Sequence, residues 1–365
     1  MPRVSVIIPT YNRADMVCEA IDSVMTQTLK DVEVIVVDDG SNDGTGDLLR
    51  ERYGERIRYF YQENQGRAVA RNRGVRASRS PYLLFLDSDD WLLPDALRQQ
   101  AEFLDAHPDV DVVYSDGYYC DATGQPIQHI SLERPPVPEG KLLEVMVLHN
   151  VVVATHSALV RRRALDRLGD PYFDETLRGT EDADLWLRLA AVGATFAYQD
   201  VLTCKYRLHE GNASSRTSPQ WQRRWQSVRR FKFKVFNADF FPDLSLPTRR
   251  EFIRQLLLVF LKSDIETQEE VLHTAHFEQL PPQYQAALLY YLGVENIVKD
   301  RAIVVGRKRL KRAIALNPRL QYRGILALSY LGHFALALVI SLRRQLERLR
   351  GKTDHSLAPH WRGLA

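Results

Sequence analysis

The sequence predicts an α/β fold: a mostly parallel, nucleotide-binding type of sheet with helices on both faces, followed by a helical C-terminal region. Up to Tyr119, short apolar runs alternate with stretches of helical period. The apolar runs lack polar alternation, which is typical of strands covered on both faces. Strands that alternate with helices require right-handed crossovers between parallel neighbours. The predicted strands are 4–8, 32–37, 57–61, 82–86 and 110–114, and the helices between them are 14–26, 45–53, 67–77 and 95–106.

The chain after Tyr119 is expected to complete this domain with a mixture of loops, helices and strands. Gly and Pro mark the turns, and helical or strand-like periods separate them. The expected elements are a hairpin turn over 121–126, an irregular loop over 133–140, a helix over 141–149, a strand over 157–160, a helix that opens near Glu181, and a strand over 195–206.

The C-terminal part changes in character. Helices are predicted over 220–236 and 249–264, and no further strands are expected. We therefore predict a domain boundary near residue 216, with an α/β domain over 1–216 and a basic helical region over 217–365.

The formal net charge of +3 over 365 residues indicates no nucleic-acid partner, but it conceals an asymmetry. Residues 216–365 hold 26 Lys and Arg against 12 Asp and Glu, which gives +14, whereas residues 1–215 carry −11. An acidic front is joined to a basic back.

Residues 324–342 form an uncharged run of 19 residues, and several arginines follow it. The run is at the lower limit for a membrane span, and basic residues beyond it suit an anionic cytoplasmic leaflet. Gly332 interrupts it. Three interpretations stay open: spanning, docking on the membrane surface, and packing in a protein core or a homodimer.

The cysteines and the N-terminus favour a cytoplasmic protein. Cys18, Cys120 and Cys204 lie far apart with no CxxC spacing, so neither a zinc knuckle nor a disulfide framework is predicted. The first apolar run is too short for a signal peptide.

Polar residues follow three predicted strands, over 9–13, 38–45 and 87–90. In open α/β sheets, ligands bind beyond the carboxyl ends of the strands. These three segments are therefore expected to converge on one binding edge.

Asp87-Ser88-Asp89 is the most chemically informative of these segments. Two carboxylates at i and i+2 share a side, and oxygen-only ligands favour Mg²⁺ or Mn²⁺, ions that bridge carboxylates to substrate phosphates. The sequence contains neither a dinucleotide fingerprint nor a GxxxxGK loop. Metal and cationic side chains are then expected to hold phosphate, with Arg67, Arg71 and Arg73 as candidates.

A second acidic segment begins at Thr180, which is expected to cap a helix whose first turn carries Glu181, Asp182 and Asp184. A carboxylate there could act as a general base on a hydroxyl. Near the end of the domain, His209 could complete the metal shell, and Arg207 or Arg216 could contact phosphate.

In these motifs the chain resembles glycosyltransferase family 2, which comprises inverting, nucleotide-sugar-dependent enzymes with the GT-A fold. The resemblance covers roughly residues 3–216 with its motifs in family order. Single motifs are weak, but the ordered set is specific. The motifs are VSVIIPTYN from Val4, VVDDGSNDGT from Val36, NQGRAVARNRG from Asn64, LFLDSDD from Leu84 and TEDADLW from Thr180.

The resemblance implies a role for each matching residue. Pro9, Thr10 and Tyr11 would line the nucleoside pocket, with Tyr11 against the base. The remaining roles are Asp39 as acceptor of a hydrogen bond from the base, Arg71 near the base and phosphates, Asp87, Ser88 and Asp89 as the DxD motif with Asp89 as the direct metal ligand, and Asp182 as the catalytic base.

The implied enzyme is a Mg²⁺- or Mn²⁺-dependent transferase that uses a UDP-sugar, or a dTDP- or GDP-sugar, and a glycan or lipid-linked acceptor. It would serve cell-surface polysaccharide biosynthesis at the cytoplasmic face of the inner membrane. Two alternatives stay open. A nucleotidyltransferase would be expected to carry a Gly-rich loop and a Lys where Pro9–Asn12 stand, and a non-catalytic nucleotide-sugar scaffold would not need Asp182.

Overall fold

The computed structural model describes residues 1–133, 138–152, 154–209, 221–260, 265–274, 277–278, 280–298, 300–334 and 336–341. The chain divides into two compact units, the first covering Met1–Val235 and the second beginning at Phe236. This division places the helix that follows residue 220 in the first unit, whereas the sequence suggests a functional boundary near residue 216.

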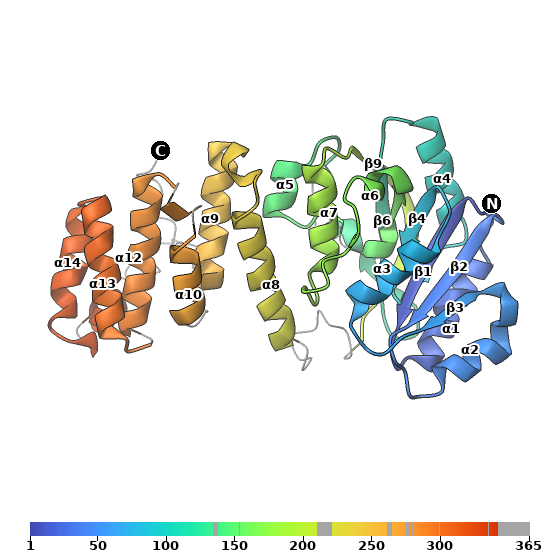
Figure 1. Ribbon diagram of the computed structural model, residues 1–365, viewed down its shortest axis with the longest axis horizontal. Coiled ribbons are helices and arrows are strands. Elements are labelled where there is room, and N and C mark those ends of the chain that lie inside the picture. Colours follow the sequence, from blue (N-terminus) through green and yellow to red (C-terminus); the bar gives the residue numbers. More distant parts are fainter. Residues whose placement is uncertain are drawn as a thin grey trace. The chain divides into compact units, whose positions relative to one another are not determined.

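The first unit is an α/β domain built around one sheet (Figure 1). Its strands and helices are β1 (Val4–Thr10), α1 (Ala14–Met25), β2 (Val32–Asp38), α2 (Thr45–Tyr53), β3 (Arg58–Tyr61), α3 (Arg67–Ala77), β4 (Tyr82–Phe85), β5 (Trp91–Leu92), α4 (Ala96–Ala106), β6 (Val112–Cys120), β7 (Pro126–His129), α5 (Leu143–Leu148), β8 (Ala158–Arg161), α6 (Arg162–Asp166), α7 (Glu181–Ala191), β9 (Phe196–Arg207) and α8 (Trp221–Phe236).

The sheet has the strand order β3-β2-β1-β4-β8-β6-β9-β5, and β7 pairs with β6. Strands β3, β2, β1 and β4 are parallel, as the sequence predicts. Strand β8 is antiparallel to both β4 and β6, and β6 is parallel to β9. The sequence predicts a strand where β8 lies, but neither its position between β4 and β6 nor the short strand β5. Pairing between segments far apart in the chain leaves no trace in the hydrophobic period of either segment.

The alternation of side chains along β1 separates the two faces of the sheet. Val4, Val6 and Ile8 belong to a core with buried residues of α1, α2 and α4. Ile7 points to α3 on the other face, where a Cβ on Gly74 would lie 2.4 Å from the Ile7 Cγ2 atom. Helices therefore cover both faces, and Gly74 allows α3 to approach β1 closely.

The β6–β7 hairpin turns at residues 121–125, as predicted. The Asp121 N–H donates to the carbonyl oxygen of Gln125 at 3.0 Å, and Gly124 has φ +82°. Cys18, Cys120 and Cys204 are free and buried. Residues 134–137 of the predicted loop lie outside the described residues.

The second unit is helical throughout the part that the structure describes. Gly306 of α13 lies against Gly293 of α12, and a Cβ on Gly306 would be 2.5 Å from the Gly293 carbonyl oxygen. The named helices are α9 (Leu246–Phe260), α10 (Ile265–Leu272), α12 (Pro282–Val298), α13 (Ile303–Leu316) and α14 (Leu320–Ser329).

The uncharged run from Gly324 does not continue one helix. α14 ends at Ser329, and Gly332 has φ +102°. Within the described residues, no helix combines the length and the apolar character that a membrane crossing requires. Leu342, the last residue of the run, lies outside the described residues.

Candidate active site

A cleft of about 820 Å³ lies at the carboxyl ends of β1, β2 and β4. The register aligns the last residues of these strands, since Thr10 of β1 pairs with Asp38 of β2. Helices α3, α7 and α8 complete its walls. Eight of the predicted site residues line it: Pro9, Tyr11, Asp39, Arg71, Asp87, Ser88, Asp89 and Asp182.

Thr10 and His209 do not line the cleft. Thr10 is buried in β1, and its hydroxyl has no hydrogen-bond partner among the described residues. His209 stands behind Asp89, with its Nε2 3.0 Å from the Asp89 Oδ2. His209 therefore contacts the predicted metal ligand directly.

Asp39 organises the loop that leads into α3. One carboxylate oxygen accepts hydrogen bonds from the Gln62 side chain at 2.8 Å and from the Gln65 N–H at 2.9 Å. The other oxygen accepts from the Gly66 N–H at 2.8 Å. Gly66 has φ +101°, a conformation that favours glycine. Tyr11 stands half-exposed on the same cleft.

Asp87 is paired with a buried arginine. The Arg71 Nη2 lies 2.6 Å from the Asp87 Oδ1, and the Arg71 side chain is 2% exposed. Burial alone would raise the pKa of Asp87, but the charges of Arg71 and Arg67 hold that pKa below its ordinary value. Asp87 is therefore a charged carboxylate with a fixed orientation.

Asp89 accepts from two groups, Arg13 and His209. Burial would raise the pKa of Asp89, whereas the hydrogen bond to His209 and the charge of Arg13 lower it below its ordinary value. Arg13 ends the 9–13 segment that the sequence places at the binding edge, but no motif assigns it a role of its own. Its side chain lines the cleft beside residues 87–90, which we call the acidic loop.

Asp90, which follows Asp89 in the same loop, forms a buried pair with His156. Asp90 and His156 are both almost fully buried, with the His156 Nδ1 3.4 Å from the Asp90 Oδ2. Burial and the neighbouring Asp89 and Asp87 raise the pKa of Asp90, and burial lowers the pKa of His156 to about 4. His156 has no sequence signal, since it lies in a short 3₁₀ turn just before β8 and belongs to no motif.

The first turn of α7 carries three acidic residues with different surroundings. Glu181 is buried and lies 3.3 Å from both Arg67 Nε and Arg71 Nη1. Asp184 is paired with Arg188 at 2.7 Å and Lys234 at 2.6 Å. Glu181 and Asp182 both line the cleft, but Asp182 has no such ion pair among the described residues.

The environment of Asp182 is suited to proton transfer. Burial and the adjacent Glu181 charge raise the pKa of Asp182 above its ordinary value. Its Oδ1 accepts from the Ala183 N–H at 2.8 Å. A carboxylate with a raised pKa that faces a cleft has the properties of a general base.

Three sequence expectations differ from the structure. Thr180 precedes α7 but makes no capping hydrogen bond with its side chain; its hydroxyl lies 2.7 Å from the Ser227 hydroxyl of α8. Arg73 donates to the Tyr61 carbonyl at 2.7 Å and does not line the cleft, and Arg207 turns away from it. The hydrogen-bond partners of long side chains depend on tertiary packing, so their position in the sequence does not predict them. Arg216 lies outside the described residues.

Helix α8 was not expected in the site, because the sequence suggests a boundary before it. Its residues Val228, Phe231 and Lys232 line the cleft. The Ser227 hydroxyl accepts from the Arg178 N–H at 2.9 Å, which ties α8 to the segment that leads into α7. The cationic and aromatic residues of α8 are the sequence feature that could have indicated its place in the cleft wall.

Among the described residues, no group of three or more His, Cys, Asp and Glu is arranged as a preformed metal cluster. Mg²⁺ and Mn²⁺ are commonly held by one or two carboxylates together with the phosphates of the substrate. Asp87 and Asp89 supply two charged carboxylates on the cleft. The donor set therefore fits such an ion.

The chain is similar to known glycosyltransferases. A family model for glycosyl transferase family 2 matches residues 5–169. The putative teichuronic acid biosynthesis glycosyltransferase TuaG of Bacillus subtilis (strain 168) is 32% identical over 229 residues, 61% of this chain and 86% of TuaG. An uncharacterized glycosyltransferase of Rickettsia typhi is 34% identical over 221 residues, 59% of this chain and 66% of the relative.

A solved structure shares the fold. The crystal structure of S. aureus TarS 1-349 in complex with UDP superposes with a TM-score of 0.51 at 20% identity, covering 90% of this chain and 91% of that one. The chain spans about one third to two thirds of the length of several curated relatives that it matches. From the family model and the similarity to TuaG, the chain belongs to glycosyltransferase family 2.

Proposed function

We propose that the protein is an inverting glycosyltransferase that moves a sugar from a nucleotide-sugar donor to a hydroxyl group of a glycan or lipid-linked acceptor. One observation carries the proposal: Asp182, with its raised pKa, lines the same cleft as the charged carboxylates Asp87 and Asp89. The cleft thus combines a base with a site for a metal and a diphosphate.

The donor would bind with its nucleoside beside Pro9, Tyr11 and Asp39 and its diphosphate beside Arg71 and the acidic loop. UDP is the first candidate, because TarS, which shares the fold, has been crystallised with UDP. A dTDP- or GDP-sugar would place the same diphosphate at the same loop.

A Mg²⁺ or Mn²⁺ ion would be held by Asp89 and Asp87, and His209, which now contacts Asp89, would be a further ligand. Such an ion would stabilise the charge of the departing nucleoside diphosphate. Arg13 and His209 now contact Asp89, so both would adjust when a cation binds there. Arg71 holds Asp87 in place and contributes positive charge beside the phosphates.

Asp182 would take the proton of the acceptor hydroxyl as its oxygen attacks the anomeric carbon. The bond from that carbon to the nucleoside diphosphate breaks on the opposite side, so a single displacement inverts the anomeric configuration. Glu181 does not compete for this role, because its ion pairs with Arg67 and Arg71 occupy its carboxylate.

The pathway would be cell-surface polysaccharide biosynthesis. TuaG is named for teichuronic acid biosynthesis, and the similarity covers most of its length.

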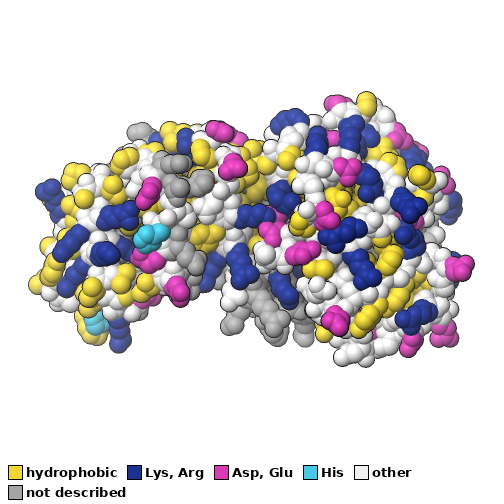
Figure 2. Space-filling view, in the orientation of Figure 1, with side chains coloured by type: hydrophobic (Ala, Val, Ile, Leu, Met, Phe, Trp, Pro, Cys, Tyr) yellow, Lys and Arg dark blue, Asp and Glu magenta, His cyan; other side chains and the backbone are white. Residues whose placement is uncertain are grey.

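The second unit offers a membrane-docking surface. Residues 301–341 contain eight Lys and Arg and no Asp or Glu. Large apolar side chains are exposed in this segment, and basic and apolar side chains adjoin over α13 and α14 (Figure 2). The most exposed are Val304, Leu320, Leu331 and Phe334. Positive charge with exposed apolar groups suits an anionic bilayer, here the cytoplasmic face of the inner membrane. A homodimer would be the other way to cover this surface.

The test is a screen of UDP-, dTDP- and GDP-sugars for turnover in the presence and absence of Mn²⁺. Release of a nucleoside diphosphate identifies a glycosyltransferase, whereas release of pyrophosphate from a sugar phosphate and a nucleoside triphosphate identifies a nucleotidyltransferase. Binding without any turnover would leave the scaffold interpretation.

A further inference from the structure

Arg207, the last residue of β9, lies directly behind the acidic loop. The residue is 5% exposed and does not line the cleft. The Arg207 Nε donates to the backbone carbonyl of Asp89 at 2.9 Å, and its own N–H donates to the Asp90 Oδ1 at 2.8 Å. Two consecutive residues of the loop are therefore fixed by one arginine.

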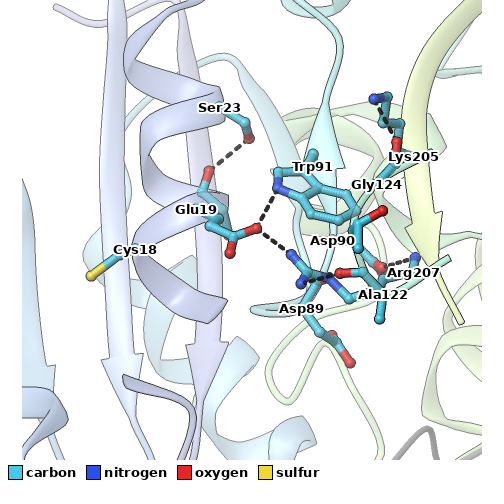
Figure 3. Close-up of polar contacts among 12 residues, drawn as sticks. Cys18, Glu19, Ser23, Asp89, Asp90, Trp91, Ala122, Gly124, Lys205 and Arg207 are labelled. Carbon is cyan, nitrogen blue, oxygen red and sulfur yellow. Dashed lines mark hydrogen bonds and ion pairs between the residues drawn. The ribbon is translucent and has the colours of Figure 1, made fainter. Parts of the chain in front are cut away.

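The same guanidinium reaches two other elements. Its Nη1 donates to the carbonyl oxygen of Ala122 in the β6–β7 turn at 3.0 Å, and its Nη2 donates to Glu19 of α1. Figure 3 shows these contacts radiating from Arg207 to the loop, the turn and the helix. Three segments far apart in the sequence thus meet on one side chain.

Trp91 closes the cluster on one face. The guanidinium carbon lies 3.8 Å from the centre of the Trp91 ring, and the indole N–H donates to the Glu19 Oε2 at 3.1 Å. A Cβ on Gly124 would lie 3.3 Å from the same ring, so the β6–β7 turn also packs against Trp91. A planar guanidinium can stack on an aromatic face and donate in several directions at once, whereas a lysine ammonium cannot do both.

We propose that Arg207 is a positioning residue that holds the Asp89 peptide so that the Asp89 carboxylate points into the cleft as a metal ligand. This inference rests on the proposed function. The carbonyl of Asp89 is bound on the Arg207 side, while its carboxylate contacts Arg13 and His209. If the Asp89 peptide rotated, the carboxylate would leave that place. Arg207 acts through Asp89 and does not touch the nucleotide.

The experiment measures UDP binding by calorimetry with Mn²⁺ and with EDTA, for the full chain and its variants. Arg207→Met is expected to reduce the gain in UDP affinity that Mn²⁺ provides by about tenfold or more, as loss of a residue that orients a metal ligand does. UDP affinity in EDTA is expected to stay within about twofold of wild type. The Mn²⁺-dependent gain of Arg207→Lys should lie between those of wild type and Arg207→Met, because lysine retains the charge and part of the hydrogen bonding.

Arg161 is the matched control. It is an arginine at the end of β8 that donates to the carbonyl oxygens of Val110 at 2.7 Å and His107 at 3.1 Å, away from the cleft. Arg161→Met should lower the melting temperature as Arg207→Met does, yet keep the Mn²⁺-dependent gain. Equal gains in the two Met variants would overturn the proposal and leave Arg207 a structural residue.

A second variant covers the case in which Arg207→Met does not fold. Glu19 is half-exposed, so Glu19→Ala removes an outer partner of Arg207 at small cost to the core. It should weaken the Mn²⁺-dependent gain by about threefold or more. An unchanged gain in Glu19→Ala and Arg207→Lys would also overturn the positioning role. If the UDP affinity of the wild-type protein were the same with Mn²⁺ and with EDTA, both the metal site of the proposed function and this inference would be contradicted.

Discussion

Glu181 and Asp182 are adjacent in the sequence, yet their carboxylates have opposite environments. Glu181 is enclosed by Arg67 and Arg71, and those charges hold its pKa below the ordinary value although burial would raise it. Asp182 faces the cleft, and burial with the charge of Glu181 raises its pKa. One turn of helix therefore carries a permanent anion and a proton acceptor side by side.

Asp182→Asn is expected to lower the rate of sugar transfer by about 10²- to 10⁴-fold, because the amide cannot accept the acceptor proton. Binding of the nucleoside diphosphate with Mn²⁺ should change little. Transfer is measured with the donor identified by the screen. Glu175→Gln is the control, since Glu175 also lines the cleft and the change removes one charge from it. Near wild-type transfer by Asp182→Asn would show that another group is the base.

The pH dependence of transfer should follow Asp182. A base must be deprotonated to accept a proton, and the pKa of Asp182 is raised. The value of kcat/KM is therefore expected to fall on acidification at a pH above that of an ordinary aspartate. A pH series with wild type and Asp182→Asn checks this, because the residual rate of the variant should lack that acidic limb. The same limb in both proteins would assign it to a different group.

Asp89→Ala is expected to weaken binding of UDP in Mn²⁺ by about tenfold or more, since the ion would lose a charged ligand. In EDTA the two proteins should differ much less. Calorimetric titrations in both buffers make the comparison. Asp47→Ala, which removes an exposed carboxylate on α2 outside the cleft, controls for the change in charge. Equal affinities with and without Mn²⁺ in both wild type and Asp89→Ala would contradict a metal site at this loop.

The second unit should bind anionic vesicles. The full chain is expected to sediment with vesicles of phosphatidylcholine and phosphatidylglycerol and not with phosphatidylcholine alone, and salt should release it. Phe334→Ser combined with Leu331→Ser should weaken binding by about tenfold or more, because two exposed apolar side chains could no longer insert. Tyr61→Ser changes an exposed aromatic residue of the first unit and should have no effect. Self-association in place of vesicle binding would assign the surface to a homodimer.

The parallel part of the sheet could be predicted because each strand carries its own signal. Apolar runs such as 32–37 and 82–86 have no polar face, and amphipathic helices separate them. The position of β8 between β4 and β6 had no such signal, because it depends on pairing between distant segments. Helix α8 was predicted as a helix, but its place beside Thr180 follows from packing.

The sequence by itself predicted that Asp39, Asp87, Asp89 and Asp182 belong to one site, and in the structure all four line one cleft. Strand ends in a parallel register meet at one edge, so local position was sufficient for the first three, and the family motif marked Asp182. Only the tertiary structure decided which partners the long cationic side chains contact. Arg13 contacts the Asp89 carboxylate, whereas Arg207 contacts the Asp89 backbone carbonyl. The physical reason is reach, because a flexible arginine selects its partners from whatever the completed fold brings within several ångströms.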